Sequence, residues 1–537
     1  MRNFTFKGLL LTAVFMLLGC LSIQAANDDL ITKQITINLD KAGTLPNKIA
    51  SSEMYKITNL KIVGEINGTD WNMIREMAGR NYQESSTEGN LSVLDLSEAK
   101  IVAGGDYYYY DNLFNNKVYT SNDEIGEYAF AYCSGLTSLT LPVGITSIGE
   151  FAFSGCSGLT SLTLPAGITS IGEYAFYGCS GLTSLNLPAG ITEIGESTFS
   201  DCSGLTSLTL PDGITSIGIS AFAYCSGLTS LTLPAGITSI NYGAFLDCSG
   251  LTSLTLPDGI TSIGSRAFYG CSGLTSLTLP AGITEIGEST FSDCSGLTSL
   301  KLPAGITSID KYAFLDCSGL TSLTLPDGIT SIGSRAFYGC SGLTSLTLPA
   351  GITSIGDDTF YGCSGLTSLT LPAGITSIGE YAFSGCSGLT SLTLPAGITS
   401  IDKYAFSGCS RLTSLTLPAG ITSIGEFAFS YCSGLTSIYV YAEKVPRIGR
   451  YAFEGCASRK CTLYVPKGTY DNYRLSEFGY FENIVEFDAT GIDKTTTSTD
   501  VEEVSRYSLN GQRLVGPTKG LNIVKYSDGS VKKVAVE

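Results

Sequence analysis

The sequence predicts a repeat solenoid for most of the chain, and three observations support this fold class. Fourteen cysteines from Cys133 to Cys432 recur every 23 residues without interruption. Each cysteine opens nearly the same segment, as in CSGLTSLTLPAGITSIGEYAFYG from Cys156. Leucine and isoleucine keep fixed places within that segment. Self-similarity at a period of about 20–50 residues is typical of solenoids, in which each copy forms one coil stacked on the next.

The first half of each copy predicts a short β-strand. Residues 159–164 read LTSLTL, which contains the LxxLxL strand signature of a leucine-rich repeat. Strand alternation directs Leu162 and Leu164 inward and Ser161 and Thr163 outward. Stacked coils then form a right-handed leucine-rich repeat solenoid with a parallel β-sheet on its inner face. Its outer face carries short extended segments and 3₁₀ or helical turns.

The second half of each copy closes the core. Ile168 and Ile171 point inward from a second short extended segment, and Ala175 and Phe176 follow in a helical or 3₁₀ turn. A lone coil cannot bury these side chains or pair its strand edges, so we expect every coil to depend on its neighbours.

The residue after the second isoleucine is chemically restricted. It is usually glycine, as at Gly172, but it is Asn241, Asp310 or Asp402 in three copies. Glycine, asparagine and aspartate are the residues that best tolerate a positive φ angle. We therefore predict a left-handed backbone conformation at this position.

The 17 cysteines raise the question of disulfides. One cysteine at the same place in every coil predicts a column of buried thiols, since free cysteine is among the most buried residue types. Parallel side chains in stacked coils also have poor dihedral geometry for a disulfide. Cys456 and Cys461 are the one local pair for which the sequence does not decide between a disulfide and free thiols.

The irregular ends are predicted to cap the array, because terminal coils would otherwise expose core and strand edges. Residues 60–62 and 91–96 resemble degenerate strands, and residues 70–79 predict a short helix. Turns are expected at Asn510-Gly511 and Asp528-Gly529. The predicted organisation is a signal peptide (1–25), an N-terminal cap with degenerate repeats (26–125), the repeat array (126–466), a C-terminal cap (467–487), a Thr-rich linker (488–503) and a strand-rich tail (504–537).

The first 25 residues are typical of a secretory signal. Arg2 and Lys7 supply the positive start, an apolar run follows from Leu9 to Leu18, and Ala25 ends a small-residue cleavage site. An alternative interpretation takes Cys20 as the lipidated residue of a lipoprotein. Both interpretations predict export.

Charge and composition exclude several function classes. The formal net charge is −17, and only 15% of residues are charged. Nucleic acids and anionic membranes attract basic patches, so neither is expected as a partner. The chain contains no histidine. Histidine-based catalysis and histidine metal sites are therefore excluded, and we expect no enzyme activity, no cofactor and no metal.

The motif LTSLTLPAGITSIGEYAFSGC resembles the BspA-like (treponemal-type) leucine-rich repeat over residues 125–466. The stretches ITNLKIVGEINGTDW and LSVLDLSEAKIV look like the cap that precedes such arrays in Gram-negative anaerobes. The tail YSLNGQRLVGPTKGLNIVKYSDGSVKKVAVE resembles the end of a type IX secretion sorting domain. The resemblance implies a secreted or surface-exposed protein of a Gram-negative bacterium, and several such proteins are adhesins that bind host matrix or other bacteria.

Two functions fit these observations. The first is adhesion to an extracellular protein or glycan through a repetitive Ser/Thr inner face. The second is a rigid spacer on the cell envelope with no specific ligand. The outward strand positions are nearly uniform, as in Ser161, Thr163, Ser207, Thr209, Ser230 and Thr232.

Breaks in this uniform face are the candidates for specific recognition. Asn186 and Lys301 replace threonine, and Arg411 replaces glycine. The column then ends in aromatic residues, which are Tyr439, Tyr441 and Tyr464. Exposed tyrosine and arginine are enriched in binding hot spots, so we expect a specific site near Arg411 and these tyrosines. The alternative is that the C-terminal cap covers the tyrosines. A tyrosine run at 107–110 is expected to pack on the N-terminal cap.

Overall fold

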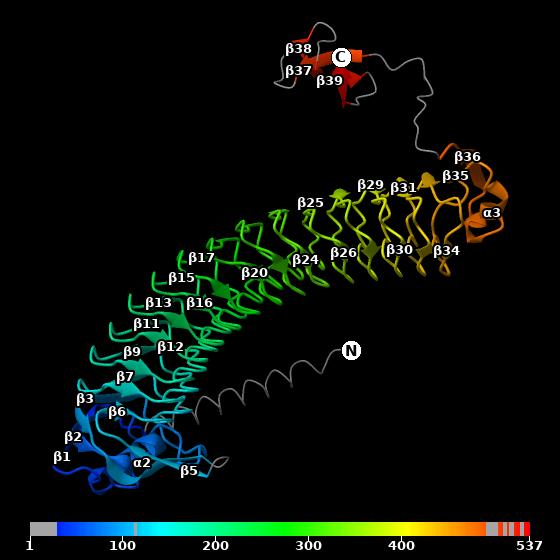
Figure 1. Cartoon of the computed structure of the whole chain (residues 1–537). Helices are drawn as coiled ribbons and strands as arrows, with labels where there is room; N and C mark the ends of the chain where they lie inside the picture. Colours follow the sequence, from blue (N-terminus) through cyan, green and yellow to red (C-terminus); the bar gives the residue numbers. More distant parts are fainter. Residues whose placement is uncertain are drawn as a thin grey trace, which may run out of the picture. The chain divides into compact units, whose positions relative to one another are not determined.

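The computed structural model describes residues 29–111, 115–489, 503–508, 513–514, 520–526 and 531–536. The chain forms two compact units, Met1–Glu486 and Phe487–Glu537. The first unit is a long stack of coils (Figure 1). The expected signal peptide with Cys20, most of the linker and the two expected turns of the tail lie outside the described residues.

Each coil contributes two short strands that pair in parallel with those of the next coil. In the copy at Cys156 these are β9 (Ser161–Thr163) and β10 (Ser170–Ile171). β9 pairs with the preceding coil in register, with Leu162 opposite Leu139. Strands of neighbouring coils thus pair with an offset of one full repeat, so each side chain lies beside its counterpart in the next coil. This confirms the parallel-strand solenoid.

The first strand of each coil reads Ser-Leu-Thr in most copies, and we call these elements the SLT strands. They are β7 (Ser138–Thr140), β9, β11 (Ser184–Asn186), β13 (Ser207–Thr209), β15 (Ser230–Thr232), β17 (Ser253–Thr255), β19 (Ser276–Thr278), β21 (Ser299–Lys301), β23 (Ser322–Thr324), β25 (Ser345–Thr347), β27 (Ser368–Thr370), β29 (Ser391–Thr393), β31 (Ser414–Leu417), β33 (Ser437–Val440) and β35 (Thr462–Pro466).

The second strand of each coil usually reads Ser-Ile, and we call these elements the SI strands. They are β6 (Glu124–Ile125), β8 (Ser147–Ile148), β10, β12 (Glu193–Ile194), β14 (Ser216–Ile217), β16 (Ser239–Ile240), β18 (Ser262–Ile263), β20 (Glu285–Ile286), β22 (Ser308–Ile309), β24 (Ser331–Ile332), β26 (Ser354–Ile355), β28 (Ser377–Ile378), β30 (Ser400–Ile401), β32 (Ser423–Ile424) and β34 (Arg447–Ile448).

A turn closes each coil and adds a third set of contacts between coils. The Ala175 N–H donates to the Gly172 carbonyl at 3.4 Å, a spacing of three residues that is typical of 3₁₀ turns. The Tyr174 and Phe176 N–H groups instead donate to carbonyls of the following coil, each at 2.9 Å. Every coil is therefore hydrogen-bonded to its neighbours through both strands and the turn.

The left-handed backbone lies two residues later than predicted. Tyr174 has a φ angle of 54° and Gly178 one of 69°, whereas Gly172 and Asn241 do not have positive φ, so the prediction was wrong. Glycine at 172 instead permits a close approach, because a Cβ there would lie 2.6 Å from the Glu150 nitrogen in the preceding coil. Asn241, Asp310 and Asp402 at the equivalent position show that three coils accommodate a side chain there. Strain of roughly 1–2 kcal/mol at each left-handed residue is offset by the hydrogen bonds between coils.

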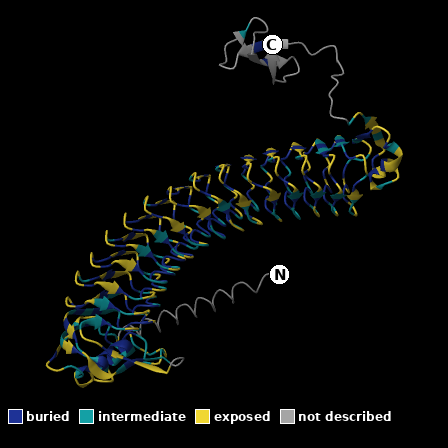
Figure 2. Ribbon diagram, viewed as in Figure 1, coloured by how far each residue is buried: buried dark blue, intermediate teal, exposed yellow. Residues whose placement is uncertain are grey.

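The core consists of columns of identical buried side chains. Buried segments run along the whole stack of coils (Figure 2). Buried phenylalanine rings stack with their centroids 5.1–5.7 Å apart along the array. Each array thiol lies beside this column, as Cys294, whose Sγ donates to the Phe268 carbonyl at 3.1 Å. All cysteines of the described residues are buried free thiols, which confirms the predicted column. Cys456 and Cys461 are also free.

The SLT strands run along the convex rim of the curved stack, and the turns run along the concave rim (Figure 1). The expected sheet is present, but it does not lie on the inner face. Stacked aromatic rings in the turns lie with their centroids 4.6–4.9 Å apart.

The N-terminal region continues the same sheet and adds a helix. β1 (Ile35–Leu39), β2 (Asn59–Ile66) and β3 (Val93–Ile101) precede β7 and β9 in one sheet, and η1 (Leu45–Asn47) lies between the first two. Helix α2 (Gly68–Met77) begins at Asn67 with a capping box formed with Asp70. The Asp70 carboxylate also accepts the N–H groups of Gly43 and Leu45, at 2.6 and 2.8 Å. β4 (Gly104–Asp111) and β5 (Asn116–Thr120) form a hairpin.

The other end of the stack is closed by α3 (Tyr470–Arg474), η2 (Glu477–Tyr480) and β36 (Asn483–Phe487). The Tyr473 hydroxyl donates to the Ala442 carbonyl, and Phe478 and Phe481 contact the last core ring, Phe453. In the second unit, β37 (Glu503–Ser508), β38 (Arg513–Leu514), β39 (Gly520–Tyr526) and β40 (Val531–Val536) form an antiparallel sheet in the order β38-β37-β39-β40.

Candidate functional site

The outward residues of the SLT strands form a row of available hydroxyl groups. Ser161 and Thr163 are exposed on either side of buried Leu162, and their counterparts repeat this pattern. The same holds for the other candidates, which are Ser207, Thr209, Ser230 and Thr232. Across residues 115–489, none of these six hydroxyls hydrogen-bonds to another residue. We call this surface, made by the outward residues of β7 to β35, the SLT face.

Two neighbouring threonine columns are different, because their hydroxyls bind the coils together. The Thr160 hydroxyl donates to the Thr137 carbonyl at 3.1 Å, and the Thr206 hydroxyl to the Thr183 carbonyl at 3.0 Å. The second column, beside the SI strands, makes the same contact, as from Thr307 to Thr284 at 3.2 Å. These threonines stabilise the stack, so the available hydroxyls belong to the SLT face.

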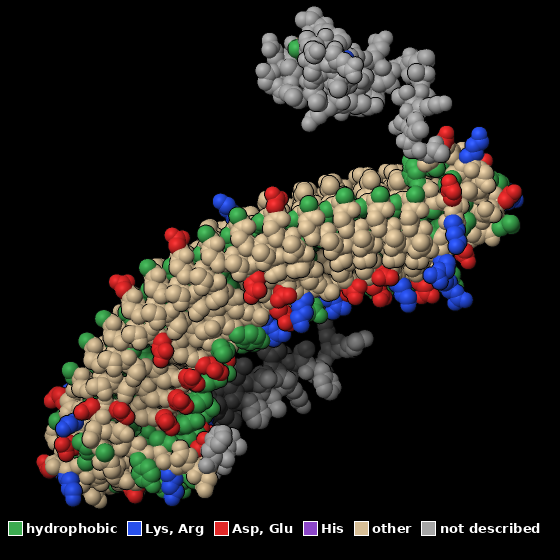
Figure 3. All heavy atoms as spheres, in the orientation of Figure 1, with side chains coloured by type: hydrophobic (Ala, Val, Ile, Leu, Met, Phe, Trp, Pro, Cys, Tyr) green, Lys and Arg blue, Asp and Glu red, His purple; other side chains and the backbone are tan. Residues whose placement is uncertain are grey.

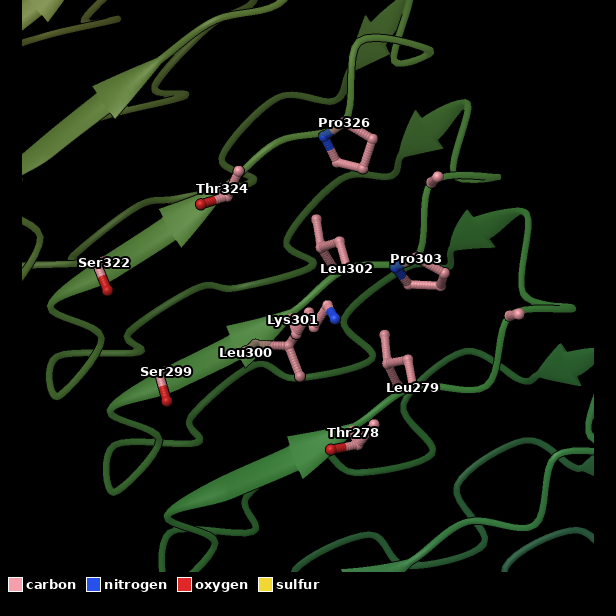
Figure 4. A pocket seen from close by; sticks show the side chains of 12 residues that line it. Thr278, Leu279, Ser299, Leu300, Lys301, Leu302, Pro303, Ser322, Thr324 and Pro326 are labelled. Carbon is pink, nitrogen blue, oxygen red and sulfur yellow. The ribbon is translucent and has the colours of Figure 1, made fainter.

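An apolar groove borders the SLT face where β19, β21 and β23 meet their proline turns (Figure 4). This section has a volume of about 830 Å³. Leu279 and Leu302 form part of its lining, with Pro303 and Pro326 beside them. A second section of about 460 Å³ has the same kind of lining at Leu369–Ala396. This groove was not predicted from the sequence, where its signal is the repeated LPAG and LPDG segments.

Lys301 is the cation that interrupts this groove. It occupies the outward third position of β21, where most coils have threonine, and lines the larger section (Figure 4). It lies in register with Thr278 and Thr324. The replacement leaves the strand pairing intact, so the outward position accepts a charged side chain without changing the fold.

The tyrosines at the end of the SLT face form a stack. Thr416, Tyr439 and Tyr464 pair in register on β31, β33 and β35. The two tyrosine rings are 4.4 Å apart and 5° from parallel. Burial is the main reason that the pKa of Tyr439 is raised, and the neighbouring Tyr464 raises it further. Both rings and Tyr441 are half-buried, so the C-terminal cap leaves part of each tyrosine accessible.

Arg411 does not join this stack. It is exposed on the turn before β31, three residues ahead of the strand. Within the described part of the chain it makes no hydrogen bond or ion pair with the tyrosines. Thr416, the residue in register with Tyr439, lies five residues further along. The structure therefore separates Arg411 from the aromatic end of the face.

The tyrosine run 107–110 lies in β4 and packs on the N-terminal region. Tyr108 is buried and donates its hydroxyl to the Glu127 carbonyl at 2.8 Å. Tyr109 stacks on Tyr128 with the ring centroids 4.0 Å apart. Two of the four rings are thus structural.

Charged residues gather on the turn side, where they follow the concave rim (Figure 3). Glu127, Glu150, Glu173 and Glu196 occupy equivalent positions in four consecutive coils. Further along the same column Lys311 pairs with Glu288 at 3.2 Å. Within the described residues, no group of three or more Asp, Glu, Cys or His side chains could hold a metal ion. No helix there is long and apolar enough to cross a membrane.

Comparisons with known proteins agree with this architecture. A model of the BspA type leucine rich repeat region (6 copies) matches residues 123–252, 239–367 and 330–460. The chain belongs to the BspA-type leucine-rich repeat family. The solenoid of this family is typically a scaffold for interactions with other proteins.

Two solved structures illustrate the relation. A leucine-rich repeat protein from Bacteroides ovatus ATCC 8483 is 30% identical, with a TM-score of 0.51, over 64% of this BspA-type chain and 88% of that one. A leucine rich cell surface protein from Faecalibacterium prausnitzii A2-165 is 31% identical, with a TM-score of 0.41, over 63% of this chain and 85% of that one. No curated protein matches the sequence.

Proposed function

We propose that this protein is an exported cell-surface adhesin that binds extracellular proteins through the SLT face. The observation that carries the proposal is the row of exposed Ser and Thr hydroxyls, repeated at the same place from coil to coil, for which the described residues provide no hydrogen-bond partner. The apolar groove beside the row supplies surface that a protein partner can bury. Family membership and the secretory character of residues 1–25 support the location.

Identical coils favour multivalent binding. Most coils offer the same two hydroxyls, and two sections of the groove lie beside them. Several weak contacts on a rigid stack act together because each bound site holds the next at high effective concentration, which raises avidity by about 10²–10⁴. The half-buried tyrosines Tyr439, Tyr441 and Tyr464 offer a stronger contact at one end of the row.

Whole-copy deletion distinguishes adhesion from the spacer function. Removing residues 225–316 deletes four complete copies and keeps the register of the remaining coils. An adhesin should lose binding to immobilised matrix proteins and to partner cells more steeply than in proportion to the length removed. A spacer should retain whatever binding its ends provide. Binding that survives removal of residues 126–466 would contradict both functions.

Point substitutions test the SLT face directly. The triple change Thr209→Glu, Thr232→Glu and Thr255→Glu places carboxylates on three adjacent SLT strands and should abolish adhesion. Lys301 shows that the position accepts a charged residue.

The matched control places the same charges on the SI strands, as Ser216→Glu, Ser239→Glu and Ser262→Glu. Glu193 and Glu285 occur naturally at this position. The control should unfold at the same urea concentration as the test variant and should still bind. Equal loss of adhesion in both variants would contradict the proposal.

A further inference from the structure

A hollow on the turn side of the array, independent of the SLT face, has the composition of a ligand site. It is an open surface depression with a volume of about 420 Å³. The residues around it come from four consecutive coils and are mostly tyrosines with one ion pair; they are Tyr312, Leu315, Arg335, Tyr338, Asp358, Tyr361 and Tyr381. We call it the turn hollow.

The turn hollow lies where a stack of turn rings ends, with Tyr312 as a single ring on its other side. On one side the column is continuous, because Tyr381, Tyr404 and Phe427 stack with centroids 4.6 and 4.8 Å apart. The next two coils place Arg335 and Asp358 at the equivalent left-handed position. Arginine and aspartate therefore take the place of two rings in the coils between Tyr312 and Tyr381, and the turn hollow lies there.

The polar groups in the gap are held in place. The Arg335 Nε donates to Asp358 Oδ2 at 3.1 Å, and its Nη1 donates to the Tyr312 hydroxyl at 3.3 Å. The guanidinium also lies over the Tyr312 ring, 5.8 Å from its centroid. Tyr338 and Tyr361 form a parallel wall, with centroids 4.6 Å apart and an interplanar angle of 9°. Donors, acceptors and apolar rings thus face one small volume.

The repeat itself provides an internal comparison. The copies at residues 248–270 and 317–339 have identical sequences, so Arg266 is the counterpart of Arg335. Arg266 Nη1 also donates to a tyrosine hydroxyl, that of Tyr242, at 2.9 Å. The coil that follows Arg266 has serine at both positions where the coil after Arg335 has Asp358 and Tyr361. The turn hollow is therefore created by one particular pair of neighbouring coils.

We propose that the turn hollow binds a neutral saccharide. A pyranose ring has an apolar C–H face that packs on tyrosine, and its edge hydroxyls match a carboxylate acceptor beside a guanidinium donor. The ion pair is neutral as a unit, so it favours an uncharged polar ligand. A nucleotide fits poorly, because Arg335 is already paired and the chain carries a net charge of −17.

The test measures binding of maltose, cellobiose and lactose to the full chain by isothermal titration calorimetry. The wild type should bind at least one disaccharide in the millimolar range. Arg335→Asn introduces asparagine, which tolerates the left-handed backbone at this position, and should weaken binding at least about tenfold. Tyr361→Ala should weaken it similarly. Arg266→Asn makes the same change in the identical coil and should leave binding unchanged.

Each outcome decides the proposal. No binding of any of the three disaccharides, or equal weakening by Arg335→Asn and Arg266→Asn, would overturn it. The glutamate variants of the SLT face should retain disaccharide binding, and Arg335→Asn should retain adhesion. Failure of adhesion therefore does not affect this inference, and failure of disaccharide binding does not affect the adhesion proposal.

Discussion

Raising the pH from 8 to 10 should destabilise the array through its cysteines. Cys225, Cys271 and Cys363 are fully buried, and burial raises the pKa of each thiol to about 12. An unfolded cysteine has a pKa of about 8.5. Folding therefore favours the protonated thiol. Its stabilising contribution is complete below pH ~8.5 and is lost as the pH rises toward ~12.

The expected effect is large because the thiols act together. Each thiol lowers the free energy of unfolding by about 1.4 kcal/mol per pH unit within that window. Cooperative opening of four coils exposes four thiols and loses about 5–6 kcal/mol per pH unit. A typical domain is stable by only about 5–15 kcal/mol. At pH 8 the raised pKa keeps the buried thiols protonated, whereas about a quarter of free thiols are ionised.

Urea unfolding followed by circular dichroism at pH 8, 9 and 10 measures this effect. Iodoacetamide labelling with intact-mass detection measures the reactivity of the thiols. We expect a transition that moves to lower urea with rising pH, and no labelling of array cysteines at pH 8 without urea. The double variant Cys271→Ala and Cys294→Ala should show a weaker pH dependence. A urea midpoint that is constant across this range would refute the reasoning, as would rapid labelling of the native array.

Three further substitutions test the stacking contacts. Thr321→Val removes the hydroxyl that donates to the preceding coil at 3.2 Å and should cost about 0.5–1 kcal/mol in urea unfolding. Asp70→Ala leaves three backbone N–H groups without their acceptor and should destabilise the N-terminal region by about 3 kcal/mol, measured as faster hydrogen exchange at Gly43 and Leu45. Glu150→Lys places a cation between two glutamates of the same column and should stabilise by about 0.5 kcal/mol at low salt, a gain that should disappear in 1 M salt.

Several structural features follow from periodicity alone. A residue that recurs every 23 positions must stack on itself, so the leucine, isoleucine, phenylalanine and cysteine columns were predictable. The polarity of Ser161 and Thr163 also follows, because strand alternation around Leu162 leaves them outside.

Other features depend on how one coil is offset against the next. Gly172 permits the close approach of Glu150, and nothing in one copy of the repeat shows which atoms approach. Arg411 and Tyr439 are both exceptions to the repeat, yet the turn before β31 separates the first from the stack that contains the second. Asp358 and Tyr361 line the turn hollow beside the coil at residues 317–339. The identical coil at residues 248–270 has serine at both positions in the coil that follows it.

The sequence by itself determined the solenoid, its buried thiol column and its repeated polar face, because each depends only on the period and on strand alternation. The tertiary structure decided which rim faces inward, where the backbone is left-handed and which exceptional residues meet. These features depend on which atoms of neighbouring coils approach one another, as Gly172 and Glu150 do, and one copy of the repeat does not specify that approach. In the resulting stack the SLT strands lie along the convex rim (Figure 1).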